Sequence, residues 1–189
     1  NNGGLKMSIL TTKHLGKIYE GKVPYTALSD INFSIEKGEF VAIMGPSGSG
    51  KSTLLNVVST IDHPNSGSVS IDGKDPHKMN DDELAHFRRS TLGFVFQDFN
   101  LIHTLTVGEN IILPLTLEGI HVPEIKKRTE EVAKMLGIEQ LLSKRIFEIS
   151  GGQAQRTAVA RAVVTNPSLL LADEPTGNLD SKATKDVME

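Results

Sequence analysis

The sequence lacks cysteine and tryptophan, and aromatic residues make up only 5% of its 189 residues. The absence of cysteine excludes disulfide scaffolds, zinc–thiolate sites and thiol catalysis, and it makes a reducing compartment the default expectation. No stretch approaches the roughly 20 apolar residues of a membrane-spanning helix, and we recognise no secretory signal. The net charge of −3 lacks the strong positive charge that is typical of a general nucleic-acid-binding protein.

The length and composition indicate one folded domain, or one domain with a subdomain. Apolar residues make up 38% and charged residues 23% of the chain, which excludes a disordered protein. Residues 1–6 precede Met7 and are interpreted as an artificial extension before a native start. The sequence stops inside residues 181–189, which have the pattern of an opening helix, so we expect an incomplete domain.

Strand and helix patterns alternate along the chain. Alternation of apolar and polar residues predicts half-buried strands at 31–35 and 68–73. Short continuous apolar runs are typical of strands in a parallel sheet that is buried on both faces, and they occur at 40–44, 92–96 and 169–172. Periodicity and end signals predict helices at 51–59, 81–89, 123–136 and 153–165.

The middle of the chain differs from the rest because it contains no run typical of a buried strand. We therefore interpret 97–150 as a helical subdomain inserted into an α/β core that comprises 7–96 and 151–189.

One segment matches the phosphate-binding pattern G-x-x-x-x-G-K-[ST], and it lies between a predicted strand and a predicted helix. Glycines allow a tight loop whose N–H groups point at phosphate oxygens, and the helix N-terminus adds partial positive charge. Lys51 is expected at the β- and γ-phosphates, Ser52 at Mg²⁺ and Thr53 near the α-phosphate. The alternative is a simple Gly/Ser-rich turn. The matching residues are Gly45, Pro46, Ser47, Gly48, Ser49, Gly50, Lys51 and Ser52.

Two acidic residues, Asp173 and Glu174, follow the apolar run 169–172. At the carboxyl end of a parallel strand they would face the same crevice as the phosphate loop. Asp173 suits the outer shell of Mg²⁺, and Glu174 suits a base that positions or polarises the attacking water. The alternative is a solvated strand end that leads into a turn at Pro175.

Further motifs resemble those of the ATP-binding cassette (ABC) ATPases. The segment that precedes the acidic strand is similar to the family's signature sequence, and Gln97 matches the Q-loop. Asp180, in Asn-Leu-Asp, matches the D-loop, and Tyr19 matches the aromatic residue that stacks on adenine. The signature residues are Ser150, Gly151, Gly152 and Gln153.

The resemblance implies a fold and a mechanism. The fold would be a P-loop NTPase (RecA-like) α/β core with a mostly parallel sheet, an N-terminal antiparallel β subdomain and the inserted helical subdomain. Two subunits would sandwich ATP and Mg²⁺, with Ser150 and Gly152 reaching the γ-phosphate in trans. Gln97 would sense the γ-phosphate and metal, and Lys51, Gln97 and Glu174 would serve catalysis. Hydrolysis would drive a separate membrane permease from the cytoplasmic face, with no role for nucleic acid.

Two stretches, 96–110 and 172–180, look like the branch that includes lipoprotein-release ATPases, macrolide exporters and bacitracin-type peptide-resistance transporters. The segment Asp-Phe-Asn-Leu at 98–101 looks most like the peptide-resistance group. Residues 144–148 lack the Val-Gly-Glu stretch that is usual before the signature in fused exporters, which argues against that type.

One family feature is missing from the sequence. ABC ATPases carry a switch histidine a few dozen residues beyond the acidic strand, whereas the last histidine of this sequence is His121. We therefore expect this chain to bind Mg-ATP but to hydrolyse it slowly.

Three alternatives stay open at the level of sequence. A soluble ABC ATPase of DNA repair would carry a long coiled coil, which is absent between Lys51 and Ser150. A ribosome-associated protein usually carries two cassettes, and a third alternative is a nucleotide-binding fragment without activity. Among single features, Tyr19 could be a packed strand-edge aromatic residue, and the aliphatic run 111–115 could contact a permease or form a core.

Overall fold

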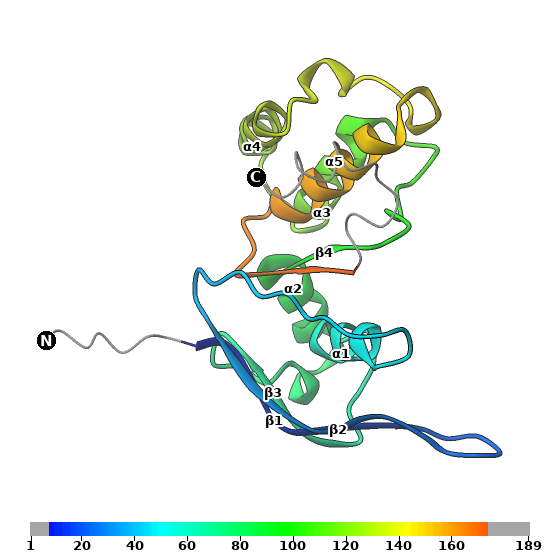
Figure 1. Ribbon diagram of the computed structural model, residues 1–189. Coiled ribbons are helices and arrows are strands. Elements are labelled where there is room, and N and C mark those ends of the chain that lie inside the picture. Colours follow the sequence, from blue (N-terminus) through cyan, green and yellow to red (C-terminus); the bar gives the residue numbers. More distant parts are fainter. Residues whose placement is uncertain (1–7, 174–189) are drawn as a thin grey trace, which may run out of the picture. The chain divides into compact units, whose positions relative to one another are not determined.

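The computed structural model describes residues 8–173 and divides the chain into two compact units, residues 1–88 and residues 89–189 (Figure 1). Each unit contains its own sheet. The units are described separately below.

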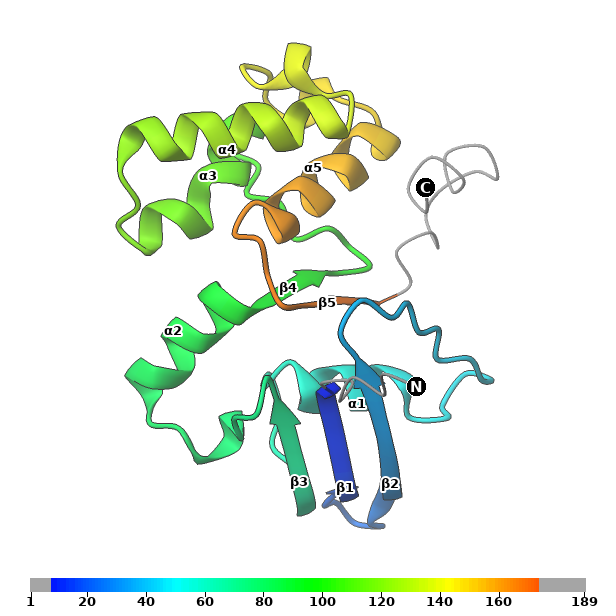
Figure 2. The same cartoon turned by 90° about the vertical axis from the view of Figure 1, so that its left-hand side faces the viewer.

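The first unit is built on an antiparallel sheet of three strands in the order β2-β1-β3 (Figure 2). The strands are β1 (Ser8–Tyr19), β2 (Tyr25–Glu36) and β3 (Ser66–Ile71). The predicted strand at 31–35 is confirmed within β2, and the prediction at 68–73 is confirmed as far as Ile71, after which Asp72 and Gly73 form a turn. The sequence did not reveal β1, because register shifts between Thr12 and Leu15 and again before Ile18 interrupt the alternation that marks a strand.

The helices of the first unit follow β2 and β3 in the chain. Helix α1 (Lys51–Val58) confirms the prediction at 51–59, and a 3-10 helix, η1 (Pro76–Lys78), follows β3. Helix α2 (Asp81–Thr91) confirms the prediction at 81–89 and leads into the second unit. Leu15, Val57, Val69 and Ile71 are fully buried, so α1 and the sheet share one core.

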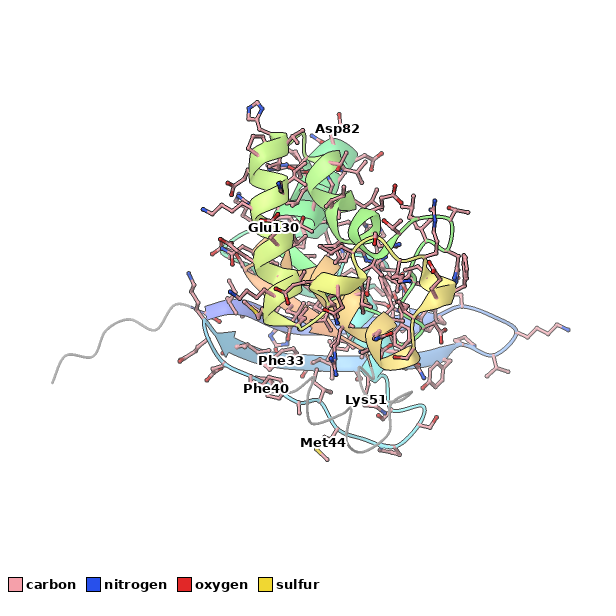
Figure 3. All side chains as sticks on the ribbon, turned by 90° about the horizontal axis from the view of Figure 1, so that it is seen from above. Phe33, Phe40, Met44, Lys51, Asp82 and Glu130 are labelled. Carbon is pink, nitrogen blue, oxygen red and sulfur yellow. The ribbon has the colours of Figure 1, made fainter. Side chains whose placement is uncertain are left out.

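The predicted buried strand at 40–44 is wrong. Residues 39–46 form no helix or strand, and Phe40 and Met44 are 78% and 89% exposed. Figure 3 shows both side chains directed away from the ribbon. A central strand needs hydrogen-bonded neighbours for its backbone, and among the described residues β1, β2 and β3 pair only with one another. Residues 40–44 have the apolar composition of a buried strand, but within residues 8–173 they lack the hydrogen-bonded neighbour that a strand requires.

The second unit contains a parallel pair of strands and three main helices. Strand β4 (Leu92–Val95) pairs with β5 (Leu169–Ala172) in the register Leu92 to Leu169 and Val95 to Ala172, which confirms both predicted runs as strands. Helices α4 (Val122–Met135) and α5 (Gly151–Val163) confirm the predictions at 123–136 and 153–165. The described residues of this unit also form helix α3 (Val107–Leu117) and two 3-10 helices, η2 (Glu139–Leu141) and η3 (Ile146–Glu148).

Helices α3, α4 and α5 pack around one hydrophobic core. Ile111 and Leu115 of α3 are buried in it together with Ala133 of α4 and Ala158 of α5. Ile111 and Leu115 belong to the aliphatic run 111–115. For these two residues the interpretation as part of a core is confirmed. No helix within residues 8–173 has the length and apolar character needed to cross a membrane.

A half-buried histidine, His77, joins η1 to the end of α1. Its Nε2 lies 2.9 Å from the carbonyl oxygen of Val57, and its Nδ1 lies 3.3 Å from Nδ1 of His63. Burial lowers the pKa of His77, and His63 and Arg88 lower it further, while the Val57 carbonyl and Asp75 act in the opposite direction. The folded protein therefore favours the neutral ring, with Nε2–H donating to Val57.

This depressed pKa predicts a loss of stability in mild acid. The unfolded chain takes up a proton on His77 below about pH 6.5, whereas the folded chain takes it up only at lower pH. The free energy of unfolding should fall between about pH 7.5 and about pH 5.5, above the range in which carboxylates titrate. Urea unfolding at several pH values measures this slope. His77→Gln keeps a donor for Val57 and should flatten the slope; an unchanged slope would contradict the assignment.

Candidate functional site

The phosphate loop connects an irregular segment to α1, and its backbone depends on glycine. Gly48 and Gly50 have φ angles of +77° and +89°, in the left-handed region that side chains disfavour. Gly50 is also the N-cap of α1, and a Cβ added there would lie 2.5 Å from the carbonyl oxygen of Ala27. Close packing against β2 thus requires glycine at this position, which a pattern match alone does not explain.

Lys51 is held above the loop by the loop's own carbonyl groups. Its Nζ donates to the carbonyl oxygens of Gly45 and Pro46, each at 2.8 Å. A cation therefore stands beside the N-terminus of α1, where Ser52 and Thr53 form the first turn. Because no acidic residue lies in that turn, the positive potential of the helix end is not neutralised from within the helix. An anion is the complementary ligand for such an arrangement.

Tyr25 is a residue near the loop that sequence reasoning missed. Its hydroxyl donates to the carbonyl oxygen of Gly48 over 2.8 Å, which fastens the middle of the phosphate loop to the first residue of β2. No local pattern signals this contact, because the two residues are 23 positions apart. Tyr25 pairs with Tyr19 across the β1–β2 hairpin.

The predicted adenine-stacking residue, Tyr19, lies at the end of β1 and is 39% exposed. Its hydroxyl donates to Asp62, and Nζ of Lys17 lies 5.0 Å from the centre of its ring. Tyr19 is therefore held by polar contacts at the surface rather than packed into the core. Its role in binding a base stays a prediction.

In the second unit, Gln97 and Asp173 follow the carboxyl ends of β4 and β5. The N–H of Asp173 donates to the carbonyl oxygen of Val95 over 3.0 Å, which continues the parallel pairing beyond β5. The two predicted metal ligands thus emerge at the same edge of the sheet, as expected for neighbouring parallel strands.

The loop after Gln97 is fixed by Arg161 of α5, a second residue that sequence reasoning missed. Its guanidinium donates to the carbonyl oxygens of Phe99 and Asn100, each at 2.7 Å. Phe99 and Asn100 both have positive φ angles, 61° and 47°, which are unfavourable for side chains. Arg161 therefore stabilises a strained turn and ties it to the helix that follows the signature.

The signature residues form the N-terminus of α5. Ser150 is the N-cap: its hydroxyl oxygen accepts from the N–H of Gln153, and the Gln153 side chain accepts from the N–H of Ser150. The predicted helix at 153–165 missed this cap, although the spacing Ser-x-x-Gln is the sequence pattern of a capping box. A Cβ on Gly151 or Gly152 would meet no atom of the described residues within 4 Å.

Helices α1 and α5 share one electrostatic feature among the five α-helices of the described residues. Neither carries an acidic residue in its first turn, whereas α2, α3 and α4 each do. The two helices whose N-termini belong to predicted ATP motifs are therefore the two that retain uncompensated positive potential there.

Two predicted site residues, Glu174 and Asp180, lie outside the described residues. Within 8–173 no cluster of three or more His, Cys, Asp or Glu side chains is suited to hold a metal ion. The predicted Mg²⁺ ligands Ser52, Gln97 and Asp173 instead offer hydroxyl, amide and carboxylate oxygens, which are hard donors of the kind that Mg²⁺ prefers.

Comparison with known proteins identifies close relatives. The family model described as ABC transporter matches residues 28–177. The ABC transporter ATP-binding protein YxdL of Bacillus subtilis is 63% identical over 96% of this chain and 71% of its own length. The bacitracin export ATP-binding protein BceA of Halalkalibacterium halodurans is 48% identical over 96% of this chain and 72% of its own length.

Solved structures give the same result. The dimeric structure of MJ0796, a bacterial ABC transporter cassette, has a TM-score of 0.86 and 45% identity over 95% of this chain and 79% of that chain. A post-hydrolysis state of the same cassette, bound to ADP and phosphate, also has a TM-score of 0.86, with 44% identity over the same shares.

Proposed function

The chain belongs to the ABC transporter family, and we propose that it is the subunit whose ATP hydrolysis drives a separate membrane permease. The phosphate loop is the observation that carries this proposal. Lys51 stands over the loop, and the open N-terminus of α1 supplies a site for the phosphates of a nucleotide. Chains of this family are ATP-binding components, and a relative of the same fold binds ADP and phosphate.

Hydrolysis is proposed to use residues at the carboxyl edge of β4 and β5. Asp173 and Gln97 emerge there, and Glu174 follows Asp173 directly as the base that orients the attacking water. Mg²⁺ bound with the nucleotide would neutralise charge on the β- and γ-phosphates. Ser52, Gln97 and Asp173 are its proposed ligands, and Asp180 is proposed as the D-loop residue.

Two copies of the chain are proposed to enclose ATP, with the phosphate loop of one facing the signature of the other. The dimeric structure of the related MJ0796 cassette supports this arrangement. In the capping box the Ser150 oxygen acts as acceptor, so its O–H is not used by that contact and is available to a γ-phosphate oxygen. Gly151 and Gly152 follow the cap without a side chain, and the described residues leave open space where a Cβ would lie.

The transported substrate is proposed to be an antimicrobial peptide, with a lipoprotein or macrolide as the second candidate. Similarity to a bacitracin export protein at 48% identity supports the first, and similarity to a macrolide export protein of Mannheimia succiniciproducens at 43% supports the second. The chain is proposed to act at the cytoplasmic face of the membrane through the permease.

Replacement of Lys51 tests nucleotide binding. Lys51→Ala should weaken binding of Mg-ATP by about 10- to 100-fold, because a charge-assisted contact to phosphate is worth about 1.5–3 kcal/mol. Isothermal titration calorimetry measures the affinity. Lys126→Ala is the control: it removes the same charge from an exposed position of α4 that pairs with Glu130, and binding should not change. Equal affinity of all three proteins would refute the proposed nucleotide site.

A matched pair of helix caps tests the dimer. Ser150 and Thr106 form the same capping box at α5 and α3, so Ala at either position should cost about 1 kcal/mol of stability. Only Ser150→Ala should abolish the dimer that a non-hydrolysable ATP analogue induces in the wild type. Sedimentation velocity measures this dimer. If Thr106→Ala and Ser150→Ala dimerised equally well, the signature would have no role in holding the phosphate.

The transport role is tested by co-expression of the chain with a candidate membrane permease. ATP turnover of the complex, reconstituted in lipid vesicles, should exceed that of the chain alone and should rise further with bacitracin. Stimulation by a macrolide instead would select the second substrate class. If the rate of ATP turnover were the same with and without the permease, a soluble ABC ATPase would be favoured.

A further inference from the structure

The segment that follows α1 is fastened to β1 beside Tyr19. Nζ of Lys17 donates to Oδ1 of Asp62 at 2.7 Å and to the carbonyl oxygen of His63 at 2.8 Å. The side-chain oxygen of Asn65 accepts from the N–H of Ile18 at 2.8 Å. These contacts join positions more than 40 residues apart and hold the last residues of β1 against residues 62–65.

Asp62 contacts both Lys17 and Tyr19 through its carboxylate. One carboxylate oxygen accepts from Lys17, and the other accepts from the Tyr19 hydroxyl at 3.0 Å. The hydrogen bond from Lys17 lowers the pKa of Asp62, so the carboxylate is ionised at neutral pH and able to accept from both donors. The N–H of His63 also donates to Oδ1 at 2.7 Å, so the carboxylate is fixed on one side and restricts both the position and the rotation of the Tyr19 ring.

Lys17 adds a constraint on which face of the ring is available. The Lys17 side chain is 12% exposed, and its ammonium group lies over the Tyr19 ring, 5.0 Å from the ring centre. This cation–π contact occupies one face of the ring. A flat base can therefore stack only on the opposite face, and Tyr19 retains 39% exposure.

Asp62 is also tied to the helix that begins at the phosphate loop. Its N–H donates to the carbonyl oxygen of Asn56 in α1 at 3.1 Å, and Thr60 of the same connection is held by the guanidinium of Arg88. The position of Asp62 therefore follows that of α1. Through this carboxylate the first unit sets the Tyr19 ring at a defined distance from the loop that holds the phosphates.

We propose that Asp62 is a positioning residue for the nucleotide base, which orients Tyr19 for stacking and sets its distance from the phosphate loop. The inference rests on the proposed function, because it presumes that the loop binds the phosphates of ATP. It assigns Asp62 no contact with the nucleotide. The binding energy of the base, and not that of the phosphates, depends on Asp62.

Comparison of ATP with inorganic tripolyphosphate separates the base from the phosphates. Asp62→Ala should weaken binding of Mg-ATP by about 3- to 10-fold, as a part of the stacking contribution of Tyr19, and should leave binding of magnesium tripolyphosphate unchanged. Tyr19→Ala should weaken binding of ATP more strongly. In the Tyr19→Ala background, Asp62→Ala should have no additional effect, since Asp62 acts only through the ring. Titration calorimetry on the full chain measures all these affinities.

Two further variants keep the test independent of folding. Tyr19→Phe removes only the hydroxyl that donates a hydrogen bond to Asp62. Because the ring is kept, this variant should weaken binding of ATP by only about 2- to 5-fold. Asp30→Asn is the control, because Asp30 is an exposed carboxylate that pairs with His14. This variant changes the net charge as Asp62→Ala does, and its affinity for ATP should equal that of the wild type.

The outcomes distinguish this inference from the proposed function. Three results would each overturn the positioning role. Asp62→Ala could weaken binding of ATP and of tripolyphosphate equally, or it could leave the affinity for ATP unchanged. In the third, the effects of Asp62→Ala and Tyr19→Ala on the free energy of ATP binding would be additive. If the wild type bound neither ligand, the proposed function itself would fail and the positioning role with it.

Discussion

The partial positive charge at the N-terminus of a helix is the physical feature on which both candidate ligand sites depend. This charge is complemented by an anion or by an acidic side chain. Helices α2, α3 and α4 place their own acidic residues there, whereas α1 and α5 do not. The phosphate loop and the signature are therefore alike physically, although their sequences differ. Each is a helix N-terminus without an acidic residue in its first turn, and there we propose that a phosphate binds.

The remainder of each unit holds these helix ends in place. In the first unit, Gly50 packs against the carbonyl of Ala27, Tyr25 fixes Gly48, and His77 contacts the carbonyl oxygen of Val57 in α1. In the second unit, Arg161 anchors the loop that begins at Gln97 to the signature helix. Three of these contacts run from the side chain of Tyr25, His77 or Arg161 to a backbone carbonyl oxygen that is distant in the sequence, so the candidate site is held by tertiary hydrogen bonds.

Much of the fold could be predicted because periodicity is a local property. The strands at 31–35 and 169–172 and the helices at 51–59 and 153–165 all form where the pattern indicated. Strand β1 was missed since its register shifts break the alternation. The run 40–44 was wrongly predicted to be a strand. Composition shows only that a segment is apolar, whereas a strand forms only where the backbone of a neighbouring strand supplies hydrogen bonds. For the site, the loop and the signature were readable as contiguous motifs with known spacing.

The sequence by itself determined which residues have the chemistry to bind phosphate, since glycines, a lysine and a capping serine stand at fixed short spacings. The tertiary structure alone decided what holds those residues in place. Asp62 reaches Tyr19 from 43 positions away, Tyr25 reaches Gly48 from 23, and Arg161 reaches Phe99 from 62. A hydrogen bond acts over about 3 Å, so such pairs exist only after packing has brought distant segments together, and no local pattern of residues encodes them.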